Sequence, residues 1–76
     1  TLERARQAAA QGNHALAYSL AKQSNSLSRS LEALELMGIS ACKAGNADNA
    51  RAAANQLTGP RRSAVVSACA QKGITI

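Results

Sequence analysis

The feature that most constrains the fold of this chain is a short segment that occurs twice, 33 residues apart. Residues 8–17 read AAAQGNHALA and residues 41–50 read ACKAGNADNA, which places a Gly-Asn pair at 12–13 and again at 45–46. Glycine is favoured just past a helix C-terminus, where the backbone is left-handed and a Cβ is penalised. The asparagine that follows can cap the next helix by accepting a backbone N–H. The repeat therefore predicts two helical hairpins with very short turns.

The spacing of small and apolar residues predicts five helices and the buried face of each. The expected ranges are residues 2–11, 14–25, 28–43, 47–57 and 60–72. The residues expected to face the core are Ala5, Ala8, Ala9, Leu16, Ala17, Leu20, Ala21, Ser24, Leu31, Leu34, Met37, Gly38, Ala41, Ala50, Ala53, Ala54, Leu57, Val65, Ala68 and either Cys69 or the adjacent Val66, with Leu36 and Ile39 beside the buried face of their helix. The fold class that follows is all-α.

The connections between these helices are expected to be short. Residues 24–29 are rich in turn formers, so we predict that they join the two hairpins and that Leu27 tucks beneath them. Thr58 and Gly59 are expected to end the fourth helix, and Pro60 suits the first turn of the fifth. Gly73 is expected to end the fifth helix, with Ile74 folding back against its last turn.

Gly38 stands inside a predicted helix, where glycine costs about 1 kcal/mol relative to alanine. Its counterpart in the first copy of the repeat is Ala5, another small residue. We therefore expect both positions to lie where a neighbouring helix passes closely.

Composition limits the remaining possibilities. The 76 residues are 46% hydrophobic, but many of these are alanines and Tyr18 is the one aromatic residue. Such a core depends on close helix–helix approach and on helix propensity. The net charge is +5, with nine basic residues dispersed along the chain, and aromatic residues for stacking nucleic-acid bases are missing. No apolar run approaches the ~20 residues of a membrane-spanning helix, so none is predicted.

The repeat resembles the tetratricopeptide repeat, which has a similar length, small residues in its first helix, Gly-Asn or Gly-Asp at the turn and alanine five residues later. The resemblance implies a right-handed superhelical stack of two repeats, residues 1–26 and 28–58, closed by a capping helix at 60–72. The matching positions are Ala5, Ala8, Gly12, Asn13, Ala17 and Ala21, and then Leu34, Met37, Gly38, Ala41, Gly45, Asn46, Ala50 and Ala54.

The chain departs from the tetratricopeptide pattern at its bulky positions. The first-helix aromatic is replaced by Thr1 in one repeat and Leu34 in the other. Large residues usual in the second helix are replaced by Ala21 and Ala54. These departures concern the superhelical angle more than the fold class.

The end of the chain has a second resemblance. Residues 57–62, LTGPRR, and 69–74, CAQKGI, are similar to the C-terminal tails of large bacterial signalling proteins, including myxobacterial serine/threonine kinases. That resemblance implies an accessory interaction domain. The chain begins at Thr1 without a methionine, so we expect it to be a fragment of a larger protein.

Few residues suggest chemistry. His14 has no carboxylate or nucleophile arranged with it locally, so a surface or packing role is expected. Glu32 and Glu35 lie three residues apart on a predicted helix, and a solvated face is the simplest interpretation. We therefore expect no enzyme activity, no catalytic residue and no cofactor.

The two cysteines allow two interpretations. Cys42 and Cys69 are 27 residues apart and form no CxxC motif, so no metal site is expected. They are either buried small residues or a disulfide that ties the third helix to the fifth. The first interpretation suits a cytoplasmic protein, which is the location we expect, and the second an exported one.

The function predicted from these patterns is protein–protein interaction. In stacked hairpins, the first helix of each hairpin lines an extended surface that can bind a segment of a partner. Arg6 and Lys43 would favour an acidic or phosphorylated segment, with Ile39 as an apolar anchor. The alternative is a basic helical domain that binds nucleic acid. By resemblance, the partner-binding residues are Leu2, Arg6, Ala9, Ala10, Glu35, Ile39, Cys42 and Lys43.

Overall fold

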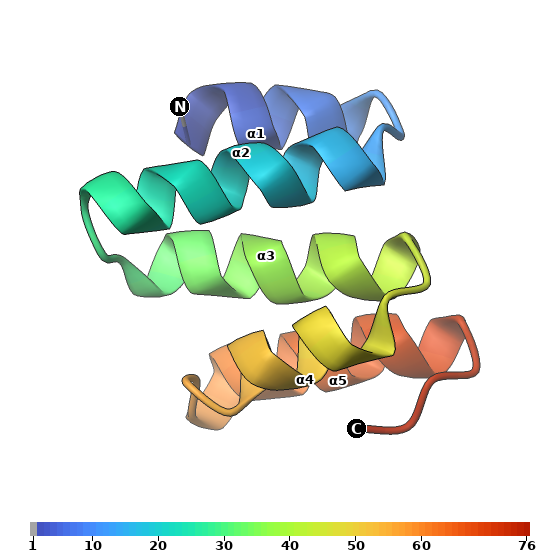
Figure 1. The fold of residues 1–76 in the computed structure, drawn as a ribbon. Coiled ribbons are helices and arrows are strands. Elements are labelled where there is room, and N and C mark those ends of the chain that lie inside the picture. Colours follow the sequence, from blue (N-terminus) through green and yellow to red (C-terminus); the bar gives the residue numbers. More distant parts are fainter. Residues whose placement is uncertain (1) are drawn as a thin grey trace.

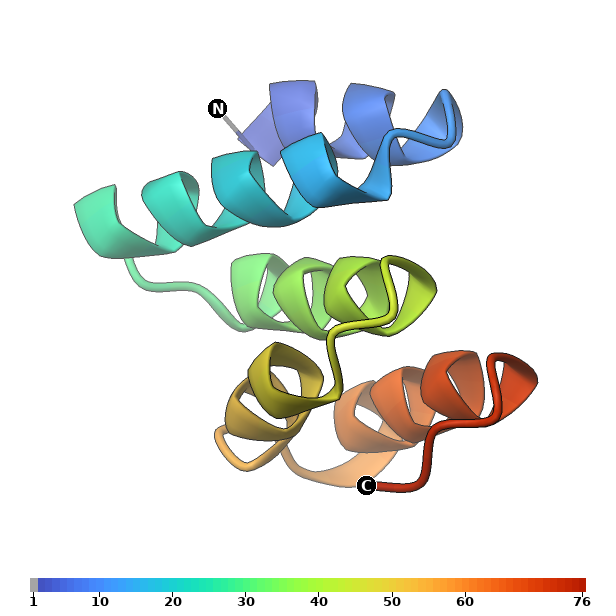
Figure 2. The same cartoon turned by 45° about the vertical axis from the view of Figure 1, so that its right-hand side comes forward.

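The computed structural model describes residues 2–76, which fold into five helices. Figure 1 shows two hairpins stacked on one another, with the fifth helix lying beside the last helix of the second hairpin. The turned view in Figure 2 separates α4 from α5 and places α1 and α5 at opposite ends of the stack. No strand forms between residues 2 and 76. The helices are α1 (Leu2–Ala10), α2 (His14–Leu27), α3 (Leu31–Lys43), α4 (Ala47–Ala54) and α5 (Gly59–Gln71).

The two hairpin turns have the predicted conformation. Gly45 has φ +82°, and the N–H of Asn46 donates to the carbonyl oxygen of Ala41 at 2.8 Å, which closes α3 in a Schellman motif. The Asn46 side chain then accepts the N–H of Asn49 at 3.1 Å and caps α4. The first turn repeats each feature, with Gly12 at φ +82°, Asn13 N–H to Ala8 at 2.9 Å and Leu16 N–H to the Asn13 side chain at 3.3 Å. One residue pair thus ends a helix and begins the next.

The end of α5 repeats the same motif. Gly73 has φ +75°, and the N–H of Ile74 donates to the carbonyl oxygen of Cys69 at 2.9 Å, as predicted. Because α1, α3 and α5 all end at a left-handed glycine, their residues can be compared by distance from that glycine. Seven residues before it stand Ala5, Gly38 and Val66.

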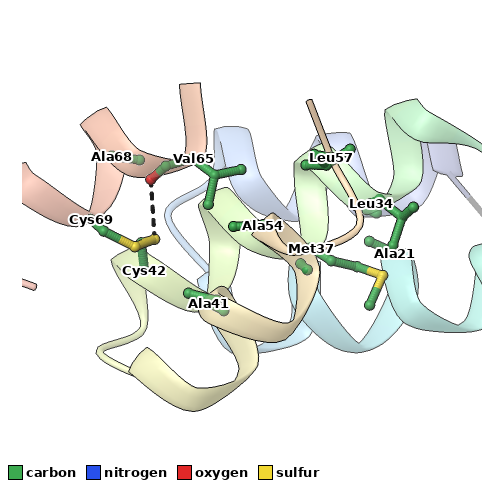
Figure 3. Packing of buried hydrophobic residues seen from close by; sticks show 13 residues of the cluster. Ala21, Leu34, Met37, Ala41, Cys42, Ala54, Leu57, Val65, Ala68 and Cys69 are labelled. Carbon is green, nitrogen blue, oxygen red and sulfur yellow. Dashed lines mark hydrogen bonds between the residues drawn. A yellow bond between two sulfur atoms is a disulfide. The ribbon is translucent and has the colours of Figure 1, made fainter. Parts of the chain in front are cut away.

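The core is built on the close approach predicted at Gly38. A Cβ added to Gly38 would lie 2.7 and 2.8 Å from the two methyl carbons of Val65 on α5, and 3.4 Å from Ala53 on α4. A side chain there would push α5 away from α3. Figure 3 shows the cluster around this contact, where α3, α4 and α5 meet. Its largest fully buried side chains include Leu57 and Val65, and most of the rest are alanines.

The connection between the hairpins differs from the prediction. The helix expected to end at residue 25 continues to Leu27, and α3 begins at Leu31 rather than near residue 28. Ser26 is helical, and its hydroxyl donates to the carbonyl oxygen of Lys22, one turn earlier. Leu27 does not tuck under the connection, since its side chain is 75% exposed. The true connection is residues 28–30, and Ser30 caps α3 by accepting the N–H of Ala33 at 3.0 Å.

Other helix limits also differ. The first helix ends at Ala10 rather than residue 11, and the last spans Gly59–Gln71 rather than 60–72. The fourth was expected to reach residue 57 but ends at Ala54. There the N–H groups of Gln56 and Leu57 bond to carbonyls three residues earlier, which tightens the chain into a turn.

Two leucines assigned to the core are exposed. The side chain of Leu16 is 45% exposed and that of Leu31 is 54% exposed. Both follow the helical spacing of buried residues, but each lies in the first turn of its helix. There the neighbouring helices cover less of the stripe than the periodicity implies.

Candidate interaction groove

A shallow cavity of about 360 Å³ lies along the face shared by α1, α3 and α5. It brings together three residues predicted to bind a partner, Arg6, Glu35 and Ile39. It adds three that the prediction did not assign to it, Glu32, Leu36 and Arg61. The three helices that line the groove, α1, α3 and α5, each end at a left-handed glycine, so the same turn follows every wall.

Two ion pairs cross the groove and join neighbouring helices. Arg6 on α1 donates to the carboxylate of Glu32 on α3 at 2.5 Å. Arg61 on α5 donates to Glu35 on α3 at 2.9 Å. The side chains of the first pair are about half exposed, and those of the second are 39% and 28% exposed. Such pairs contribute about 0–1 kcal/mol each to stability, so their main effect is to set the charge pattern of the groove.

That pattern alternates across the groove. Arginines stand on the flanking helices α1 and α5, and the two carboxylates stand on the central helix α3. Leu36 and Ile39, also on α3, line the same cavity and are partly buried against the core. The groove therefore offers an apolar floor with charges of both signs along its rim.

The other predicted residues lie along the same helices but outside the cavity. Leu2 is half-buried one turn before Arg6, and Lys43 is exposed one turn after Ile39. Ala9 is half-buried and Ala10 is exposed near the end of α1. Lys43 forms no ion pair with any residue from 2 to 76.

Cys42 was wrongly assigned to the groove. It is fully buried, because α5 packs over the face of α3 that carries Gly38 and Cys42. The sulfur atoms of Cys42 and Cys69 lie at disulfide distance, with Cα atoms 4.6 Å apart, and Figure 3 shows the bond linking α3 to α5. The two cysteines are thus both buried and paired.

Sequence reasoning missed Glu32 and Arg61 for different reasons. Glu32 was assigned only to a solvated face, and no local pattern shows its arginine partner, which is 26 residues away in the chain. Arg61 is followed by Arg62, and the local sequence does not show which of the two arginines faces the groove. In the structure, Arg62 is the exposed one. The signal that could have found Arg61 is the third glycine turn, which identifies α5 as a helix of the same kind as α1 and α3.

The remaining candidates for chemistry stay apart from one another. Among residues 2–76, no three His, Cys, Asp or Glu side chains gather closely enough to hold a metal ion. His14 lies at the start of α2, with its Nδ1 buried and without a hydrogen-bond partner among these residues. No helix in the described part of the chain is long and apolar enough to cross a membrane.

Comparison with known proteins found no match to any family model, any curated protein or any solved structure.

Proposed function

We propose that this chain is a non-catalytic protein–protein interaction module that binds a segment of a partner protein in the groove of α1, α3 and α5. One observation carries the proposal: three helices bring two apolar side chains of α3, Leu36 and Ile39, together with four charged side chains in one cavity. Interfaces combine an apolar centre with a polar rim in this way.

We further propose that the fold is a tetratricopeptide-like array with a right-handed stack. The support is the 33-residue repeat, the shared glycine turns and asparagine caps, and the close approach at Gly38. In such arrays the first helix of each hairpin lines the binding surface. A place as an accessory domain of a bacterial signalling protein, where catalysis is performed elsewhere, is part of the same proposal.

The ligand we propose is an acidic or phosphorylated segment with at least one apolar side chain. Lys43, which forms no ion pair among residues 2–76, offers a positive charge one turn beyond Ile39. Arg6 is already paired with Glu32, so an acidic ligand competes with that carboxylate and gains less there. Most of the affinity would then come from covering Leu36 and Ile39, with charge setting specificity and association rate.

A peptide selection tests the groove. We expect the wild-type chain, screened against a displayed library of random peptides, to enrich ligands that lose binding to Ile39→Thr and Ile39→Glu variants. The matched control is Leu27→Glu, because Leu27 is an exposed leucine on α2, outside the groove. Far-ultraviolet circular dichroism checks that each variant keeps its helices. Peptides that bind both Ile39 variants normally would place the binding surface elsewhere.

The second candidate is a basic helical domain that binds nucleic acid. It is favoured by six exposed basic residues that form no ion pair with any part of the described chain, namely Arg4, Lys22, Arg29, Lys43, Arg62 and Lys72. A salt titration separates the two candidates. Binding to a random-sequence duplex that falls steeply with salt indicates phosphate contacts. Peptide binding that depends on Ile39 and only weakly on salt indicates the groove.

A further inference from the structure

The bond between Cys42 and Cys69 joins two helices of the groove wall, α3 and α5, that differ in how many of their residues are buried. Cys42 lies near the end of α3, the central helix, and Cys69 lies near the end of α5. Both residues are fully buried. Besides the backbone between α4 and α5, this bond is a second covalent connection between α5 and the hairpins (Figure 3).

Few side chains hold α5 without that bond. Within the helix only Val65, Ala68 and Cys69 are buried, and two of these are small. The face around Arg62 and Val66 is exposed. By contrast, seven residues of α3 are buried. The position of α5 therefore depends on the disulfide, whereas α3 is held in place by many other buried residues.

In the reduced protein, contacts of Cys42 and Val65 should keep α5 in place most of the time. The sulfur of Cys42 lies 3.4 Å from the carbonyl oxygen of Val65, marked by the dashed line in Figure 3. In the reduced state, the Cys42 thiol can donate a weak hydrogen bond to that oxygen. The contacts of Val65 with Gly38 and Ala53 also remain. Loss of the bond should therefore increase local opening of α5 rather than unfold the chain.

From these observations we propose that Cys42 and Cys69 form a redox latch that controls how firmly α5 closes the groove. A dithiol reductant attacks one sulfur, gives a mixed disulfide and releases the other cysteine as a thiol. The second thiol of the reductant then resolves the mixed disulfide, which leaves two cysteine thiols and the reductant oxidised to its own disulfide. Because both cysteines are buried, the first attack requires α5 to move away from α3.

The latch acts on the groove through Arg61. While the bond is closed, α5 keeps Arg61 beside Glu35 and completes the third wall of the cavity. When the bond is reduced, that wall opens more often, and a ligand that needs all three helices binds more weakly. This effect on binding rests on the proposed function, whereas the latch itself does not. In an oxidising compartment the groove would be locked, and in a reducing one it would be loosened.

Hydrogen exchange measured by mass spectrometry on the full chain tests the latch without any ligand. We expect reduction by a phosphine to accelerate amide exchange at least tenfold in residues 62–71 and to leave residues 14–27 of α2 unchanged. Equal acceleration in both segments would mean that the bond stabilises the whole chain and is no latch. Unchanged exchange in residues 62–71, or a chain whose thiols stay free in oxidised glutathione, would also overturn the proposal.

A variant without the bond provides the control. The Cys42→Ala, Cys69→Ala double variant should exchange like the reduced chain, with or without phosphine. If this variant does not fold, the comparison of oxidised and reduced wild-type protein still decides. Peptides from the selection above separate the two proposals. Faster exchange in α5 with unchanged peptide affinity would retain the latch and reject the groove as the binding site.

Discussion

Two glycines of α3 and its turn show how one residue type serves two physical purposes. Gly45 has φ +82°, and an added Cβ there would meet nothing within 4 Å. Gly38 lies in a helix with no room for a Cβ beside Val65. Backbone conformation requires glycine at the first position, and packing requires it at the second. Substitution by alanine should therefore lower the stability of the protein for different reasons at the two positions.

At Gly45, we expect alanine to reduce the free energy of unfolding by about 1 kcal/mol or more, because a Cβ opposes the left-handed conformation. Urea denaturation followed by circular dichroism measures the change. Ala44→Gly, at the αR residue directly before the turn, is the control for altered chain entropy. An unchanged unfolding midpoint for Gly45→Ala would contradict the turn assignment.

At Gly38, we expect alanine to cost about 1–3 kcal/mol, because its Cβ would overlap the methyl groups of Val65 at 2.7 and 2.8 Å. The second substitution Val65→Ala removes those methyl groups. The same denaturation experiment on both single variants and the double variant gives the coupling between the positions. The double variant should lose less stability than the sum of the single variants. Additive losses would show that Val65 is not what excludes a side chain at Gly38.

At the scale of helices, the sequence was a reliable guide wherever structure follows from local chemistry. The turns at Gly12, Gly45 and Gly73 were predictable because glycine has one favourable use there, and asparagine caps the next helix after the first two. The connection after Leu27 was not predictable, because serines suit both a turn and the end of a helix. Which of the two forms depends on where α3 must begin to pack, and that is a tertiary property.

Helix α5 is the element whose removal we expect to matter most. Truncation after Gly59 would uncover the face of α3 that carries Gly38 and Cys42. It would also remove the disulfide that ties α5 to α3. We expect the truncated chain to lose cooperative thermal unfolding or to aggregate, as measured by calorimetry and light scattering. The full chain carrying Cys42→Ala and Cys69→Ala separates the loss of the bond from the loss of the helix. A truncated chain that unfolds sharply and stays monomeric would contradict this role of α5.

At the scale of the whole molecule, the two ends of the stack differ from its interior in the same way. Arg4 and Gln7 of α1 are exposed at positions where α3 has the buried residues Met37 and Ser40. At the other end, Arg62 of α5 is exposed where α3 has the buried residue Leu34. Polar outer faces of this kind are what the end units of stacked arrays need.

The groove also becomes visible only at this scale. Its ion pairs join residues 26 positions apart, so the sequence could place Arg6, Glu35 and Ile39 on suitable helices but not identify their partners. Periodicity could not tell the face of α3 that meets the groove from the face that meets α5 either. Cys42 was therefore assigned to the wrong side.

The last prediction concerns charge across this groove. Reversing two charges, Arg6→Glu with Lys43→Glu, places a carboxylate next to Glu32 and removes the unpaired lysine beyond Ile39. We expect an acidic peptide obtained from the selection to lose binding, because like charges repel and slow association. Helicity should be unchanged, since both side chains are exposed. The control is Lys22→Glu with Arg51→Glu, which makes the same change in net charge on α2 and α4. Isothermal titration calorimetry at low and high salt distinguishes the two double variants. If the control pair abolishes binding and the groove pair does not, the partner docks on the surface of the second helices instead.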